Sequence, residues 1–173
     1  MERRENLALI GFMGAGKSTV GAALARRLGM DFVDLDGVIA GEAGMSIPEI
    51  FDREGEEGFR ERESRALRKE LKGAGKVLAC GGGIVLRPEN VDLLRERCLV
   101  VYLRVDRNTV LNRVGEGEGR PLLAGGPLPR RVEELLSERE EKYLRASHAV
   151  VEAGGRTPEG IAEEIAGIWK ESW

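Results

Sequence analysis

A glycine-rich stretch near the N-terminus, GFMGAGKS at residues 11–18, constrains this chain more than any other feature. The apolar run LALI at residues 7–10 comes directly before it, and the helical pattern STVGAALARRLG follows from Ser18. A Gly-x-x-x-x-Gly-Lys-Ser/Thr pattern between a strand and a helix is typical of a P-loop, whose backbone amides surround phosphate groups. Because a chance glycine-rich turn would lack both flanking elements, we predict a P-loop nucleotide-binding fold.

The P-loop also suggests roles for its side chains. Lys17 can reach the β- and γ-phosphates of a nucleoside triphosphate, and the Ser18 hydroxyl can bind Mg²⁺. The nucleotide-binding residues that we expect in this segment are Gly14, Ala15, Gly16, Lys17, Ser18 and Thr19. The phosphate acceptor stays open at this point, because kinases, motors and switch GTPases share the loop.

Short apolar runs alternate with helical patterns along the rest of the chain. The runs that we interpret as buried strands are residues 7–10, 32–35, 77–80, 99–103 and 149–151. This alternation favours an α/β domain with a parallel sheet, and 173 residues suit a single domain. The glycine- and proline-rich segment 115–129 lacks periodicity and carries a lone Arg120, so we predict that it is a lid.

Composition argues against several other classes of protein. With 42% hydrophobic and 33% charged residues and a net charge of −3, the chain has no positive excess for nucleic acid or anionic membranes. The apolar stretch at the N-terminus is too short for a signal peptide or a membrane span, so we expect a cytoplasmic protein. Cys80, Cys98 and His148 show no metal-ligand spacing, and we predict two buried thiols and a structural histidine.

Three further features should meet at the carboxyl ends of the strands, where parallel sheets bind their ligands. They are Asp34 and Asp36 at the end of the second strand, Arg60 on a following helix, and the glycine run 81–83 after the third strand. On an extended strand, the carboxylates of Asp34 and Asp36 would point to the same face.

Each of these features also has a simpler interpretation. The aspartates could cap a turn, Arg60 could lie on a solvated helix face, and the glycines could form a flexible turn. Together, however, a carboxylate pair, a fixed cation and closely approaching amides beside a triphosphate describe a small polar pocket. Because a guanidinium binds a carboxylate bidentately, the pocket suits a small, hydroxylated and anionic acceptor.

In the order and type of these motifs, the chain resembles the shikimate kinase family. The resemblance runs from about residue 8 to residue 165 and rests on GFMGAGKST, FVDLD, SIPEIFDREGEEGFRERE, CGGG and RPLL. It implies a P-loop fold of the nucleoside-monophosphate-kinase-like type, whose five-stranded parallel sheet has the strand order 2-3-1-4-5 and is flanked by helices. It also implies an enzyme that uses Mg²⁺ and transfers the γ-phosphoryl group of ATP to the 3-hydroxyl of shikimate. We further expect a monomer.

The resemblance further implies roles for individual residues. Asp36 matches the aspartate that binds the acceptor hydroxyl, as a base or an orienting group, and Asp34 matches the one that supports Mg²⁺ through water. Lys17, Asp36 and Arg120 are then the catalytic candidates, with Arg120 closing over the phosphates from the lid. The other implied residues are Arg60, Arg139, Gly81, Gly82 and Gly83 for shikimate, Glu63 for orienting Arg60, and Arg113 and Arg156 for the nucleotide.

One departure from the family pattern and three rival functions stay open. Where relatives commonly read Arg-x-Pro-Leu-Tyr, this chain has Glu141-Lys142 in place of Pro-Leu, which puts the local helix start in doubt and leaves Arg145 as a rival to Arg139. A gluconate kinase would show Asp-x-x-His, whereas residues 36–39 read Asp-Gly-Val-Ile. The other rivals are a nucleoside monophosphate kinase and a nucleotide switch without turnover; a lid arginine and an acceptor pocket argue against the switch.

Overall fold

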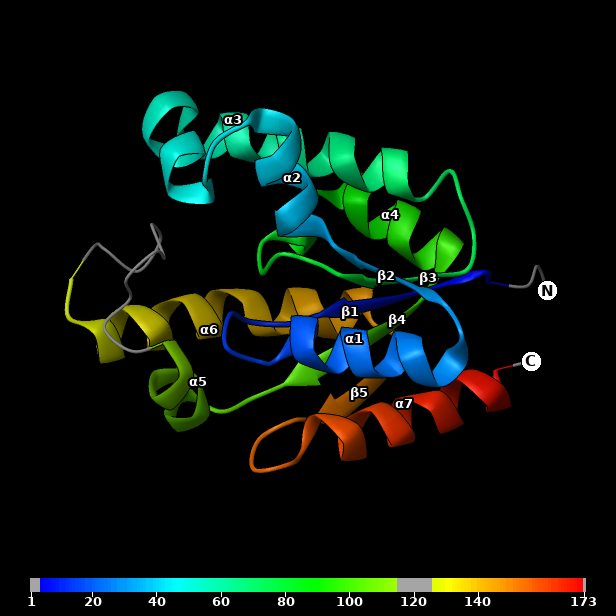
Figure 1. Cartoon of the computed structure of the whole chain (residues 1–173). Coiled ribbons are helices and arrows are strands. Elements are labelled where there is room, and N and C mark those ends of the chain that lie inside the picture. The colour runs from blue at the N-terminus through cyan, green and yellow to red at the C-terminus, as the bar shows by residue number, and fades with distance from the viewer. Residues whose placement is uncertain (1–3, 115–125, 173) are drawn as a thin grey trace.

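The computed structural model describes residues 4–114 and 126–172. They form three layers, with a parallel β-sheet between two layers of helices (Figure 1). The strands are β1 (Asn6–Ile10), β2 (Asp31–Asp34), β3 (Lys76–Ala79), β4 (Cys98–Arg104) and β5 (Ala149–Glu152). Their order is β2-β3-β1-β4-β5, and each neighbouring pair is parallel, which confirms the predicted fold class.

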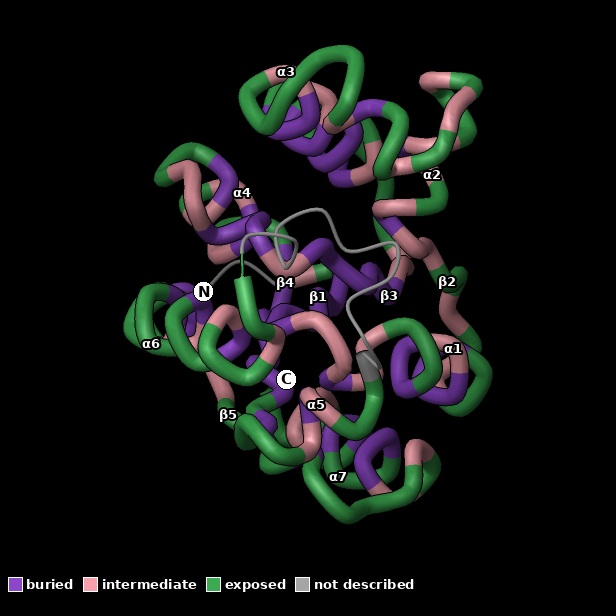
Figure 2. Tube along the Cα trace, turned by 90° about the vertical axis from the view of Figure 1, so that its left-hand side faces the viewer, coloured by how far each residue is buried: buried purple, intermediate pink, exposed green. Residues whose placement is uncertain are grey.

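Helices connect successive strands, and a last helix follows β5. They are α1 (Lys17–Leu28), α2 (Leu35–Ala43), α3 (Ile47–Glu70), α4 (Pro88–Arg97), α5 (Arg107–Val114), α6 (Leu128–Ala146) and α7 (Pro158–Glu171), with a 3-10 turn at Ile84–Leu86. Helices α1 and α7 pack together on one face of the sheet, and α4 and α6 pack against β4 on the other (Figures 1 and 2). Helices α2 and α3 pack on each other beyond the carboxyl end of β2.

The central strands form the core of the domain. Every residue of β1 is buried, as are the first six residues of β4, because helices cover both faces of the sheet (Figure 2). The edge strand β2 is only partly covered, and its Phe32 is exposed. Since β1 lies in the middle of the sheet, its carboxyl end brings the P-loop to the centre of one edge of the molecule.

Several local predictions are confirmed. Gly29 ends α1, and Ser46 and Glu49 form the capping box that begins α3. Both cysteines are buried and free. His148 has a structural role, because its Nδ1 accepts a hydrogen bond from the Val100 backbone at 3.0 Å and burial lowers its pKa to about 4.

Helix α2 is the main element that the sequence did not predict. The second strand ends at Asp34, whose extended backbone makes it the N-cap of α2, and Asp36 lies in the first helical turn. The prediction that both aspartates share one strand face is therefore wrong. A carboxylate in the first turn is favourable, since it faces the positive end of the helix dipole.

One predicted boundary also changes. The predicted lid extended to residue 129, but α6 already begins at Leu128, with Pro129 in a first-turn position where proline is favoured. Glu141 and Lys142 lie well inside α6, so no helix begins at the departure from the family pattern. None of the helices in residues 4–114 and 126–172 is long and apolar enough to cross a membrane.

Candidate active site

The loop after β1 has a backbone that only glycine adopts easily. Gly11, Gly14 and Gly16 have φ angles of 149°, 80° and 88°. A Cβ atom on Gly11 would lie 2.5 Å from the carbonyl oxygen of Leu103, so a side chain there would collide with β4. Gly16 is the N-cap of α1, and the helix therefore directs its first amides and its positive dipole end at the loop.

Two cations contact this loop. The Lys17 Nζ donates hydrogen bonds to the carbonyl oxygens of Gly11 at 2.5 Å and Phe12 at 3.1 Å. From α5, the Nη1 of Arg113 donates to the carbonyl oxygen of Gly14 at 2.9 Å. Both residues therefore lie beside the backbone of the P-loop.

Ser18 and Asp34 form the candidate metal site. The Ser18 hydroxyl donates a hydrogen bond to Asp34 Oδ2 at 3.3 Å, so the two side chains face each other across the start of α1 and the end of β2. Hydroxyl and carboxylate oxygens are hard ligands that fit Mg²⁺, which commonly combines one or two protein ligands with water and substrate phosphates. Within the described part of the chain, no group of three or more His, Cys, Asp and Glu side chains could hold a metal by itself.

Asp36 approaches the glycine run (Gly81, Gly82 and Gly83) instead of Ser18. A Cβ atom on Gly81 would lie 2.9 Å from Asp36 Oδ1 and 2.8 Å from Glu63 Oε2. Real side chains essentially never pack this closely, so the absence of a side chain at Gly81 lets both carboxyl groups reach the backbone. The two aspartates thus face different groups, although for another reason than strand periodicity.

Arg60 and Glu63 form a buried ion pair on α3. Arg60 is 6% exposed and Glu63 is 0% exposed, and Arg60 Nη1 donates to Glu63 Oε1 at 3.0 Å. Burial raises the pKa of Glu63, whereas the charge of Arg60 and its hydrogen bond act to lower that pKa. The simpler interpretation of Arg60 as an arginine on a solvated face is therefore wrong.

Arg139 from α6 meets Arg60 over the same glycine run. A Cβ atom on Gly83 would overlap the Arg60 guanidinium, and one on Gly82 would lie 3.4 Å from Arg139 Nη1. Arg139 is buried like Arg60. Two guanidinium groups from separate helices therefore converge where the sequence predicted an anionic acceptor.

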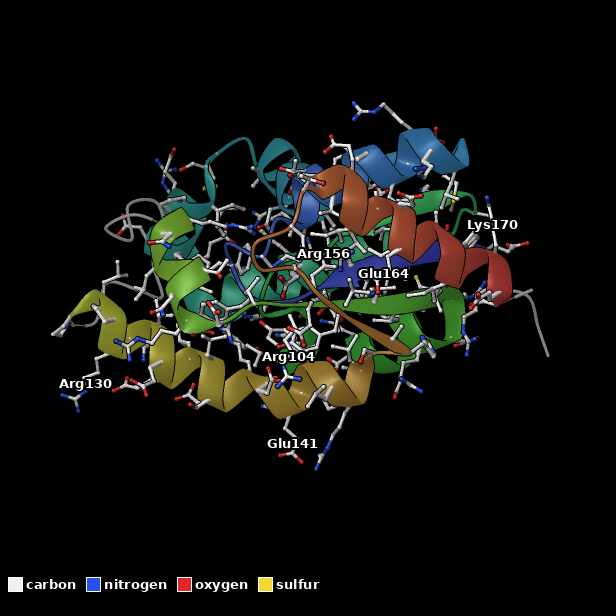
Figure 3. All side chains as sticks on the ribbon, turned by 90° about the horizontal axis from the view of Figure 1, so that it is seen from below. Arg104, Arg130, Glu141, Arg156, Glu164 and Lys170 are labelled. Carbon is white, nitrogen blue, oxygen red and sulfur yellow. The ribbon has the colours of Figure 1, made fainter. Side chains whose placement is uncertain are left out.

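The rival arginine lies elsewhere. Arg145 is exposed and pairs with Glu141 at 2.5 Å. Figure 3 shows Glu141 pointing away from the sheet, on the outer side of α6. This geometry favours Arg139 over Arg145 as the acceptor arginine.

The remaining predicted residues are at the periphery or outside the described ranges. Arg156 Nη1 donates to Glu164 Oε2 at 2.6 Å and to the carbonyl oxygen of Glu152 at 3.0 Å, which ties the loop after β5 to α7 (Figure 3). Arg120 and residues 115–125 of the predicted lid lie outside the described residues.

Sequence reasoning missed two tyrosines behind the glycine run. The Tyr143 hydroxyl donates to the carbonyl oxygen of Gly82 at 2.6 Å, and its ring stacks on Tyr102 with centroids 5.0 Å apart. Burial raises the pKa of Tyr143 to about 12. The available signal was the spacing of one helical turn between Arg139 and Tyr143, which puts both on one helix face.

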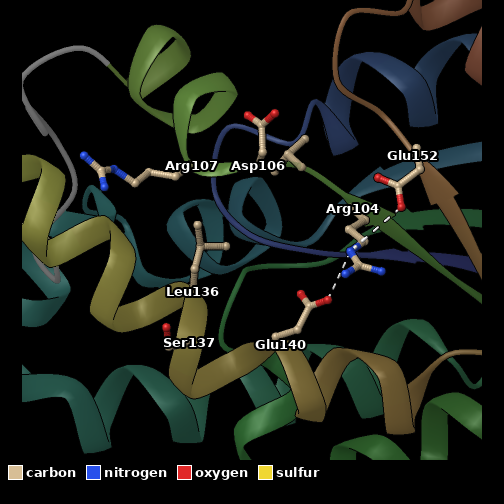
Figure 4. A pocket seen from close by; sticks show the side chains of 8 residues that line it. Arg104, Asp106, Arg107, Leu136, Ser137, Glu140 and Glu152 are labelled. Atoms are coloured by element: carbon tan, nitrogen blue, oxygen red, sulfur yellow. Dashed lines mark ion pairs between the residues drawn. The ribbon is translucent and has the colours of Figure 1, made fainter.

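A separate cavity of about 380 Å³ lies at the carboxyl ends of β4 and β5, between α5 and α6 (Figure 4). Arg104 Nε lies 3.1 Å from Glu140 Oε1 and 3.8 Å from Glu152 Oε1, so charges in its wall are paired. None of the predicted site residues lines this cavity, which is therefore distinct from the candidate active site.

A sequence model of the shikimate kinase family matches residues 13–169, the range that holds the aspartates, the glycine run and both buried arginines. This chain belongs to the shikimate kinase family. The shikimate kinase of Geobacter sulfurreducens is 45% identical to it over 96% of this chain and 91% of that protein. The shikimate kinase of Marinomonas sp. is 42% identical over 95% of this chain and 92% of that protein.

Solved structures agree with this assignment. The shikimate kinase from Acinetobacter baumannii in complex with shikimate has a TM-score of 0.94 at 36% identity, covering 99% of this chain and 96% of that one. A gluconokinase from Sinorhizobium meliloti has a TM-score of 0.58 at 17% identity, over 99% and 95% of the two chains, which shows a common fold only. Shikimate kinases are ATP-dependent phosphotransferases that act on an alcohol. The gluconate-kinase alternative has less support, because the family model and the relatives of higher identity are shikimate kinases.

Proposed function

We propose that this chain transfers the γ-phosphoryl group of ATP to the 3-hydroxyl of shikimate, giving ADP and 3-phosphoshikimate. The observation that carries the proposal is the convergence of Asp36, Arg60 and Arg139 on the glycine run. This run lies against the P-loop: a Cβ atom added to Gly82 would be 3.7 Å from the carbonyl oxygen of Gly11. The shikimate complex of the Acinetobacter relative supports the choice of acceptor.

On the nucleotide side, the backbone of residues 14–19 binds the phosphates of ATP, assisted by Arg113 and Arg156. Lys17 exchanges its contacts with loop carbonyl groups for the β- and γ-phosphates, and Arg120 adds a second cation from the lid. Ser18 directly and Asp34 through water would hold Mg²⁺, which neutralises phosphate charge when it is bound. The positive charges of the protein thus stabilise the negative charge on the phosphate oxygens during transfer.

On the acceptor side, Arg60 and Arg139 bind the carboxylate of shikimate, and Glu63 keeps Arg60 in place. The glycine run lets the substrate approach the backbone closely. Asp36 accepts a hydrogen bond from the acceptor hydroxyl and directs its oxygen toward the γ-phosphorus of ATP. Positioning of this kind provides most of the catalysis in phosphoryl transfer, since the protein forms no bond to the phosphoryl group.

A coupled assay of ADP release tests the proposal, with shikimate, gluconate and nucleoside monophosphates offered separately. We expect Mg²⁺-dependent release with shikimate and background release with the others. Release with gluconate alone would support the rival kinase, and ATP binding without release for any acceptor would support a switch. We also propose a cytoplasmic monomer, and light scattering during size-exclusion chromatography tests the monomer.

A further inference from the structure

The central carbonyl group of the glycine run is held differently from the other two. The Gly81 carbonyl accepts a hydrogen bond from the backbone of Ile84, and the Gly83 carbonyl accepts one from the backbone of Leu86, each at 3.1 Å. The Gly82 carbonyl accepts its hydrogen bond from the Tyr143 side chain, at 2.6 Å. The orientation of the central peptide group therefore depends on a side chain from another element, α6.

The same tyrosine hydroxyl lies beside the acceptor arginine. A Cβ atom on Gly82 would be 3.6 Å from the Tyr143 hydroxyl and 3.4 Å from Arg139 Nη1, so both groups lie close to Gly82. The charge of Arg139 also acts to lower the pKa of Tyr143, against the stronger effect of burial. The Tyr143 hydroxyl thus contacts Gly82 and lies next to Arg139.

The ring of Tyr143 is fixed by its surroundings. It is fully buried and stacks on Tyr102, whose hydroxyl donates a hydrogen bond to Glu140 Oε2. Glu140 lines the cavity of Figure 4 and not the candidate active site. The hydroxyls of the two stacked rings therefore point to different sites. The Tyr143 hydroxyl contacts the acceptor site, and the Tyr102 hydroxyl contacts Glu140 outside it.

We propose that Tyr143 is a positioning residue for the acceptor. Its hydroxyl fixes the Gly82 peptide group and supports Arg139, while its ring anchors both to β4 through Tyr102. It acts through these two groups and does not touch the phosphate or the acceptor itself. This inference rests on the proposed function, and it adds to that function a residue that sets acceptor affinity.

The substitution Tyr143→Phe removes the hydroxyl and keeps the stacked ring. It leaves a carbonyl group without its donor, and we expect the KM for shikimate to rise about tenfold. The KM for ATP should stay within about twofold of the wild-type value, since the P-loop keeps its own contacts. The matched control is Tyr102→Phe, which removes the other hydroxyl of the same stack and should leave the KM for shikimate within about twofold.

Hydrogen exchange of the segment 81–86 without substrate separates this proposal from the proposed function. We expect faster amide exchange in Tyr143→Phe than in the wild type or Tyr102→Phe, with melting temperatures recorded for all three proteins. If the wild type does not phosphorylate shikimate, the proposed function is wrong. The exchange rates would still decide whether Tyr143 orders the glycine run. Unchanged exchange in Tyr143→Phe, or an equal rise in the KM for shikimate in both variants, would overturn the positioning role.

Discussion

The nucleotide half and the acceptor half of the site are built by different means. On the nucleotide side, one contiguous segment at the start of α1 supplies backbone amides, and the flanking Ser18 and Arg113 are exposed. On the acceptor side, α2, α3, α6 and the glycine run each contribute, and Arg60, Glu63 and Arg139 are buried. The phosphate-binding loop is thus encoded locally in the sequence, whereas the acceptor site exists only in the folded domain.

This difference has an energetic consequence. Removing an exposed side chain beside the P-loop removes a contact and little else, since water replaces it. Removing Arg60 leaves Glu63 buried without its hydrogen-bonded counterion, which costs stability as well as binding. Substitutions on the acceptor side should therefore affect both folding and the acceptor, and substitutions on the nucleotide side should affect mainly ATP.

Asp36→Asn should have the largest effect, because Asp36 is the residue that we propose to contact the reacting hydroxyl. The substitution keeps the size of the side chain. We expect kcat to fall about 100- to 10,000-fold, since an amide is a poor acceptor for the hydroxyl proton. ATP affinity, measured by titration, should stay near the wild-type value. The metal-side counterpart Asp34→Asn should instead raise the Mg²⁺ concentration needed for turnover. If Asp36→Asn retains more than about a tenth of the wild-type rate, Asp36 has no such role.

Arg60→Ala comes next and tests the buried cation. The loss of a charge-assisted contact should raise the KM for shikimate about 100-fold and leave the KM for ATP nearly unchanged. The melting temperature should also fall, because Glu63 stays buried without Arg60.

The matched control for Arg60 is Arg62→Ala on the same helix. Arg62 donates two hydrogen bonds to Glu54, each at 2.9 Å, but this pair is partly exposed, unlike the buried Arg60–Glu63 pair. Its removal should leave the KM for shikimate near the wild-type value. If both substitutions raise the KM for shikimate equally, the total charge of α3 controls acceptor binding, and Arg60 has no specific role.

The same contrast explains how much could be predicted from the sequence. The P-loop and the five strands were predictable because the relevant residues are neighbours and follow short periods. The prediction that all five strands are buried is wrong for the edge strands β2 and β5, which are only partly buried. Helix α2 was missed because it is short and contains Gly37 and Gly41, which are poor helix formers, and because Asp34 ends the strand and caps the helix at once. Local reasoning therefore failed where one residue serves two elements.

The acceptor side needed information that no local pattern contains. Arg60 lies in a run of charged residues, where burial of one arginine cannot be distinguished from exposure of all. The expected pocket suggested Arg60 as its cation, but only the family resemblance supplied Arg139. Tyr143 was missed because its partner, the Gly82 carbonyl, belongs to the backbone and is 61 positions away along the chain.

Arg113→Ala should have a smaller effect, confined to the nucleotide half. Arg113 is exposed and contacts the P-loop through a hydrogen bond to Gly14, so we expect the KM for ATP to rise about three- to tenfold. The KM for shikimate should not change. Arg107→Ala is the control on the same helix, since its partner is the exposed Glu133 and not the loop. A comparable rise in the KM for shikimate would show that the two halves are coupled through α5.

Glu141→Ala should have the smallest effect and tests whether the departure from the family pattern reaches the site. Glu141 and Arg145 are both exposed, and surface pairs of this kind contribute little, so kcat, both KM values and the melting temperature should match the wild type. The reason lies in α6, which continues without interruption through Glu141 and keeps Arg139 and Tyr143 on its buried face. A KM for shikimate raised more than about threefold would mean that the outer face of α6 sets the position of Arg139. Such a result would shift control of the acceptor half from its buried contacts to the helix that carries them.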